Sequence, residues 1–105
     1  MAKPRTLIPI HPGDILLHQF LEPLKLSQNQ LARDIDVPAT RVNDIVNGNR
    51  PITVDTAIRL SRYFGNSSQF WLNLQQRFDL MVAERELGST LDKKIQPLRE
   101  GIASR

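Results

Sequence analysis

The segment spanning residues 26–64 constrains the fold more than any other part of this 105-residue chain, because helix caps, apolar spacings and helix breakers follow one another in order. Ser27 opens the segment as a good N-cap, since its hydroxyl can accept a backbone N–H from the next turn. Apolar residues then recur at helical spacing, at Leu31, Ala32 and Ile35. We therefore predict a helix of about two turns after Ser27.

A tight corner is predicted at residues 36–38, whose sequence is Asp-Val-Pro. The residue before a proline is pushed out of the α region, and aspartate occupies a left-handed corner at lower cost than a bulky side chain. A second helix can begin directly afterwards. It should end at residues 47–49, where Asn-Gly-Asn is a left-handed C-cap signal, and Pro51 prevents it from resuming.

The second helix has one apolar side and one polar side. Val42, Ile45 and Val46 share the apolar side. At about 100° per residue, small polar residues point the opposite way. They are Thr40, Asp44 and Asn47, with Arg41 and Asn43 at the edges. We therefore expect this helix to present a polar outward face.

Helices are also predicted on both sides of this pair. Thr53 caps a third helix that ends at Gly65 and has apolar positions at Ala57, Ile58, Leu60 and Phe64. Before the pair, residues 11–14 read as the start of a helix, because proline and an acid suit the first turn, and Pro23 is expected to end it.

A longer helix is predicted over about residues 69–86, capped by Ser67 or Ser68. It gathers apolar residues on one side, at Trp71, Leu74, Phe78, Met81 and Val82. The whole pattern predicts an all-α, five-helix domain over residues 1–88. A tail over residues 89–105 follows, which either contains one short helix at 91–95 or is mobile.

The first two helices of residues 26–64 suit a nucleic-acid partner. A major groove admits one α-helix, and a short amphipathic helix with small polar side chains outward can enter it. Spacing alone leaves a second interpretation open, in which the pair is an ordinary helical hairpin buried in a bundle.

The segment resembles the lambda-repressor-like (XRE) helix-turn-helix family. The likeness rests on Leu-Ser-Gln at residues 26–28, Leu-Ala at 31–32, Asn-Gly at 47–48, and on Val37, Val42 and Ile45. More narrowly, HPGDIL at 11–16, VNGNRPITVDTAIRLSRYFG at 46–65 and FWLNLQQRFDL at 70–80 resemble the HigA-type antitoxins, also called virulence-associated protein I-like. One departure is Asp36, at a corner that is often glycine in such motifs.

The resemblance implies a small dimeric repressor. Such a protein binds an operator next to its own genes and neutralises a partner toxin, usually a RelE-like endoribonuclease that cuts translated mRNA. The residues that match base-facing and groove-edge positions of such domains are Pro38, Ala39, Thr40, Asp44 and Asn47. We expect backbone contacts from Gln28, at the start of the first helix of the motif, and from Arg41 and Asn43. Arg50 is either a phosphate contact or a solvated surface charge.

A second apolar stripe on the long helix predicts a partner surface. It consists of Leu72, Leu80, Ala83 and Leu87, with Gln76 among them, and lies away from Trp71 on a helical wheel. A symmetric dimer contact would use it, and packing against the C-terminal tail is the alternative. A dimer also suits DNA, because two half-sites about 34 Å apart allow both helices to engage.

The half of the chain that contains the predicted DNA-binding helices is less basic than the net charge of +3 suggests. Residues 1–50 hold six basic and five acidic side chains, a net of +1. Because phosphate neutralisation supplies most non-specific DNA affinity, we expect modest non-specific binding and a reliance on dimerisation and fit. A protein-interaction module without useful DNA affinity, or a regulator without a toxin, remains open at this point.

Other classes find little support in the sequence. The absence of cysteine excludes disulfides and thiolate zinc sites, and no apolar run approaches the roughly 20 residues needed to span a bilayer, so we expect a cytoplasmic protein. No P-loop, G-x-S-x-G or H-E-x-x-H pattern occurs, so we expect neither an enzyme nor a cofactor. His11, Asp14 and His18 form only a weak candidate metal site, because a further strong ligand is missing.

Overall fold

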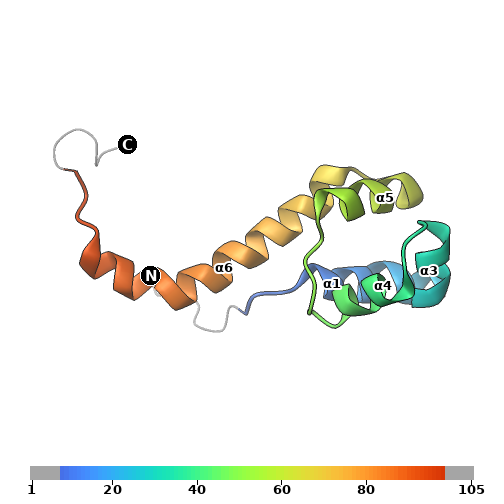
Figure 1. The fold of residues 1–105 in the computed structure, drawn as a ribbon, viewed down its shortest axis with the longest axis horizontal. Coiled ribbons are helices and arrows are strands. Elements are labelled where there is room, and N and C mark those ends of the chain that lie inside the picture. Colours follow the sequence, from blue (N-terminus) through green and yellow to red (C-terminus); the bar gives the residue numbers. More distant parts are fainter. Residues whose placement is uncertain (1–7, 99–105) are drawn as a thin grey trace.

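The structure is a computed structural model that describes residues 8–98, and within that range every regular element is helical. The first helix is continuous and consists of α1 (Pro12–Ile15), the π-helical segment η1 (Leu16–Leu21) and α2 (Glu22–Leu24). It is followed by α3 (Gln28–Asp34), α4 (Ala39–Val46), α5 (Val54–Phe64) and α6 (Ser68–Lys94). The all-α, five-helix fold that the sequence predicts is therefore confirmed (Figure 1).

The predicted caps form as expected. The Ser27 hydroxyl accepts the N–H of Gln30 at 3.0 Å, and the Thr53 hydroxyl accepts the N–H of Thr56 at 3.4 Å. Of the two candidates before α6, Ser67 is the N-cap. Each cap satisfies a backbone donor that a helix start leaves unpaired, so the boundaries of α3, α5 and α6 are set locally.

The predicted left-handed positions are present as well. Asp36 has a φ of 61° at the corner between α3 and α4, and Gly48 and Gly65 have φ of 79° and 81° after α4 and α5. These residues reverse the chain within a few residues. As a result α3 and α4 pack as the expected helix-turn-helix.

The core joins the first helix, α3, α4 and α5 and is completed by the start of α6. Its buried apolar side chains include Leu16, Leu31, Ile45, Leu60 and Trp71, of which Trp71 is the largest. A polar link also crosses it, since the buried Gln75 of α6 accepts the N–H of Ile52 at 2.8 Å. The loop before α5 is thereby fixed to α6.

Pro23 does not end the first helix, contrary to the sequence prediction. It lies inside α2, and the helix continues to Leu24. Just before it, the N–H of Glu22 bonds to the carbonyl of Leu17, five residues back, as in a π-turn. The π-helical segment ends at Leu21, two residues before the proline, whose ring and missing N–H disturb an ordinary helix, and the helix ends one residue after Pro23.

Helix α6 is longer than the predicted 69–86. It runs to Lys94, so residues 91–94 form its last turn, and no separate short helix occurs among the described residues of the tail. Residues 99–105 lie outside the described range. Gly88 does not interrupt the helix, at a cost of only about 1 kcal/mol relative to alanine. The proposed division after residue 88 stays a prediction, although the helix crosses it without a break.

One of the apolar residues of α5 lies at the surface. Ile58 is 41% exposed, whereas its neighbours Ala57 and Leu60 are buried. At about 100° per residue, the side chain next to Ala57 turns out of the core toward the α3 corner.

None of the helices within residues 8–98 combines the length and apolar character needed to cross a membrane.

Candidate nucleic-acid interface

The polar face predicted for α4 points outward. Val42, Ile45 and Val46 are buried against the core. On the other side, Pro38, Ala39, Thr40 and Asn47 are exposed, and Arg41, Asn43 and Asp44 are half-buried. The N-terminal end of α4 and one further residue at its other end thus form an accessible polar surface.

Two of the predicted contact residues are bound to one another. The side-chain amide of Asn43 donates to Oε1 of Gln28 at 2.8 Å, which joins α4 to the first residue of α3. Both side chains are half-buried. The pair fixes the relative position of α3 and α4 and still borders the exposed surface, so these residues are less free than the sequence suggests.

Arg41 belongs to an ion-pair network that sequence reasoning did not find. Its Nη1 donates to Oδ2 of Asp55 at 2.7 Å, and Nε of Arg59 donates to the same carboxylate at 3.1 Å. The hydrogen bond from Arg59 is the main cause that lowers the pKa of Asp55, with a further contribution from Arg41. The pair of Asp55 and Arg59 could have been predicted from the sequence, because residues four positions apart on a helix are neighbours. The contact with Arg41 could not, because Arg41 lies on another helix.

The other predicted charge on this face, Arg50, lies near Asp44. The closest nitrogen and oxygen are 3.5 Å apart, and both side chains are close to half exposed. Exposed pairs at this distance are weak, about 1 kcal/mol at most. Arg50 is therefore held loosely beside the end of α4.

The predicted dimer residues lie along one side of α6. Leu72 and Ala83 are half-buried, and Gln76, Leu80 and Leu87 are exposed. Leu80 is 61% exposed and Leu87 is 50% exposed. The far part of the stripe forms a shallow apolar groove, which Gly88 and Leu91 extend.

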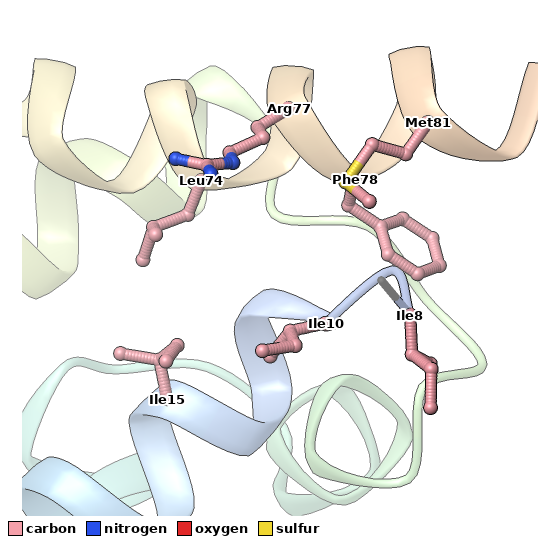
Figure 2. Close-up of a pocket in the computed structure, with 7 residues that line it drawn as sticks. All are labelled: Ile8, Ile10, Ile15, Leu74, Arg77, Phe78 and Met81. Atoms are coloured by element: carbon pink, nitrogen blue, oxygen red, sulfur yellow. The ribbon is translucent and has the colours of Figure 1, made fainter. Parts of the chain in front are cut away.

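A separate apolar pocket of about 280 Å³ lies between α6 and the segment before α1 (Figure 2). Side chains from α6 face three isoleucines across it, and the lining residues are Ile8, Ile10, Ile15, Leu74, Arg77, Phe78 and Met81. Arg77 is the one charged residue of this lining. The pocket has no pair of acid and base groups, so it offers no arrangement for catalysis.

The weak metal candidate does not assemble. His11 is buried at the start of α1, where its Nδ1 accepts the N–H of Gly13 at 2.9 Å, while His18 is exposed and bonds to Glu22 at 3.0 Å. Within residues 8–98, no three histidine, cysteine or acidic side chains lie close enough to hold a metal ion. Both histidines have local structural partners instead.

The chain is similar to known proteins both in sequence and in structure. The helix-turn-helix family matches residues 17–71, which include α3, α4 and α5. Virulence-associated protein I of Dichelobacter nodosus is 49% identical over 77 residues, covering 73% of this chain and 71% of that protein.

Two solved structures contain similar chains with DNA. The Pseudomonas aeruginosa antitoxin HigA with the higBA promoter has a TM-score of 0.86 and 47% identity, and the match covers 88% of this chain and all of that chain. The antitoxin GraA in complex with its operator has a TM-score of 0.84 and 37% identity, covering 90% of this chain and 95% of that chain.

Proposed function

This chain belongs to the XRE-type helix-turn-helix family of HigA-like antitoxins, and we propose that it binds operator DNA as a repressor and neutralises a toxin. Its relatives are DNA-binding antitoxins and regulators, a non-enzymatic family. The proposed DNA contacts come from α4, from Gln28 at the start of α3, and from Arg50.

The observation that carries the DNA proposal is the exposure of α4. Its N-terminal residues and Asn47 project from a helix that packs against α3 and α1, at a size that a major groove accepts. Thr40 can contact a thymine methyl group or donate a hydroxyl, and Asp44 can accept from cytosine N4. The relatives that were solved with promoter or operator DNA support the same use of the fold.

We further propose that two copies pair through the apolar stripe of α6. One small module buries only about 600–1,000 Å² on DNA, so a single copy would bind weakly and a pair would engage two half-sites. The exposed leucines of α6 give such a pair an apolar surface to bury.

The antitoxin role is proposed from the relatives that carry this name. A RelE-like endoribonuclease is the expected toxin. Co-purification tests this role: the chain is expressed together with the untagged product of the adjacent gene. Retention of that product on the tagged chain would support the role. Its absence, with operator binding intact, would point to a repressor that acts without a toxin.

The DNA proposal is tested with a double variant of α4. Thr40→Ala with Asn43→Ala is expected to abolish the specific mobility shift of the protein's own upstream DNA, because the loss of a base contact from Thr40 costs about 1–3 kcal/mol and the loss of a backbone contact from Asn43 adds to it. The matched control makes the same two changes on α6, at the exposed Asn73 and Thr90, and should bind as the wild type does. Unchanged operator affinity of the α4 variant would contradict the proposal.

Because Asn43 also binds Gln28, the single variants are needed as well. Thr40→Ala removes only an exposed side chain and should weaken operator binding without changing the thermal unfolding midpoint. Titration at several salt concentrations separates specific binding from phosphate attraction, which falls steeply with salt.

A further inference from the structure

The polar network behind α4 connects three segments that are far apart in the sequence. Arg59 of α5 reaches the corner between α3 and α4, where its Nη1 donates to the carbonyl of Ile35 at 2.8 Å and to that of Asp36 at 3.0 Å. Ile35 is the C-cap of α3, so its carbonyl belongs to the end of a helix that lacks intrahelical donors. A guanidinium satisfies both carbonyls at the negative end of the helix dipole.

The same guanidinium is held in place by Asp55. Nε of Arg59 lies 3.2 Å from Oδ1 and 3.1 Å from Oδ2 of this carboxylate. Oδ2 also accepts from Nη1 of Arg41 at 2.7 Å. Asp55 therefore links the arginine that fixes the corner to an arginine on the recognition helix itself.

We propose that Asp55 and Arg59 are positioning residues for DNA binding, which hold Arg41 and the α3–α4 corner in the geometry that engages the duplex. This inference rests on the proposed function and adds two residues to it. Arg41 is only 29% exposed in its pair with Asp55, so much of its side-chain freedom is already lost before DNA arrives. A side chain that is ordered in advance loses less entropy on binding.

Because Asp55 is negatively charged, the direction in which DNA affinity changes when it is neutralised tests the proposal. A carboxylate beside a DNA-binding helix repels phosphate, so its direct effect on affinity is unfavourable. Any favourable effect of Asp55 must therefore act through the arginines it holds. Neutralising this residue should raise DNA affinity if it is a bystander and lower it if it is a positioning residue.

The experiment measures operator affinity of Asp55→Asn by mobility shift, using the full chain. Asparagine keeps the size of the side chain and removes the charge. We expect a loss of about two- to five-fold for each half-site, a range typical of exposed ion pairs. Asp92→Asn, which removes one charge from the exposed end of α6, is the matched control and should bind as the wild type does.

A double-mutant cycle with Arg41→Gln separates positioning from a general loss of stability. In the Arg41→Gln background, Asp55→Asn should weaken binding less than it does in the wild type, because the contribution through Arg41 is already lost and only the contact of Asp55 with Arg59 remains to be removed. Equal losses in both backgrounds would overturn the role through Arg41.

A second variant, Arg59→Lys, tests whether Arg59 holds the α3–α4 corner in the geometry that binds DNA. Lysine keeps the charge but lacks the planar fork that spans two carbonyls and a carboxylate. Operator affinity should fall while the melting temperature changes little, because Arg59 is half-buried outside the apolar core and lysine keeps a positive charge beside Asp55. Wild-type affinity in this variant would overturn the role of Arg59.

The outcomes distinguish this inference from the function on which it rests. If the wild type gives no specific shift, the proposed function and the inference both fail. If the wild type binds and Asp55→Asn binds equally or more tightly, the inference alone fails. In free protein, nuclear magnetic resonance of the Arg41 Nε–H group should show slower motion in the wild type than in Asp55→Asn, and equal motion would also contradict it.

Discussion

At the scale of single residues, Gly13 allows a close approach between the backbones of α1 and α4. A Cβ atom at this position would overlap the carbonyl oxygen of Ile45 and lie 3.0 Å from the Cα atom of Val46. Gly13 is buried, and the atoms it meets are backbone atoms at the end of α4, which are not free to move aside. The first turn of α1 therefore sets the position of α4 through a residue without a side chain.

Gly13→Ala is accordingly expected to lower the free energy of unfolding by about 2–3 kcal/mol, as overpacked substitutions in cores do. Urea denaturation measures the change. Gly88→Ala is the matched control, because a Cβ there meets only Oε1 of the exposed Glu84 side chain, at 3.3 Å. This second variant should be stabilised by about 0.5–1 kcal/mol. Similar effects of the two variants would contradict the close approach.

At the scale of elements, the start of α1 depends on a neutral histidine. Nδ1 of His11 accepts the N–H of Gly13, and its ring packs edge-on against Phe78 of α6, with centroids 4.9 Å apart. Burial lowers the pKa of His11, and the charges of Asp14 and Asp79 oppose this shift. A protonated ring would have a hydrogen on Nδ1 and would lose the cap.

The contribution of His11 to the stability of the wild type should therefore fall as the pH drops below about 6.5, the ordinary pKa of histidine. Because the folded protein binds the His11 proton less readily than the unfolded chain, this contribution is complete above that pH and declines toward the lower pKa of the folded state. His11→Asn retains a capping oxygen without titrating, and it should flatten this decline in thermal unfolding between about pH 5 and 7.

His18 must be replaced in both proteins for this comparison. Its hydrogen bond to Glu22 raises the pKa of His18, so its effect on the pH dependence has the opposite sign. In a His18→Gln background, an equally steep decline with His11 and with Asn at position 11 would show that other groups cause it.

At the scale of the whole molecule, the fold is elongated, with principal extents of 54 × 26 × 24 Å. The first helix and α3 to α5 form a compact bundle, and α6 starts against this bundle and extends well beyond it (Figure 1). Leu80, Leu87 and Leu91 lie exposed on the extended part. A helix that leaves its own core with exposed leucines is expected to find apolar contacts in a second chain.

Leu80→Glu should therefore give monomers and weaken operator binding, because a charge replaces an apolar contact on both copies. Sedimentation velocity measures the oligomeric state, and mobility shift measures the binding. Leu24→Glu is a fair control, since Leu24 is 60% exposed, close to the 61% of Leu80, and lies outside α6. A dimer that survives Leu80→Glu would remove the α6 stripe as the contact.

Much of the fold follows from the sequence because its signals are local. The caps at Ser27 and Thr53, the corner at Asp36 and the glycines after α4 and α5 depend on neighbours within a few residues. The outward face of α4 also follows from helical spacing alone. Two predicted helix ends were wrong: the first helix includes Pro23 and ends at Leu24, directly after a π-turn, and α6 continues past Gly88 to Lys94.

The sequence alone thus determined which segments are helical, where most of them start and which face of α4 is polar, since backbone hydrogen bonding and side-chain periodicity act over short distances. Only the tertiary structure decided that Asn43 binds Gln28, that Asp55 and Arg59 hold Arg41 and the corner, and that Gly13 sits against Ile45. These contacts join residues 14 to 32 positions apart in the chain. Packing of the helices creates them, and no pattern along the chain specifies such pairs.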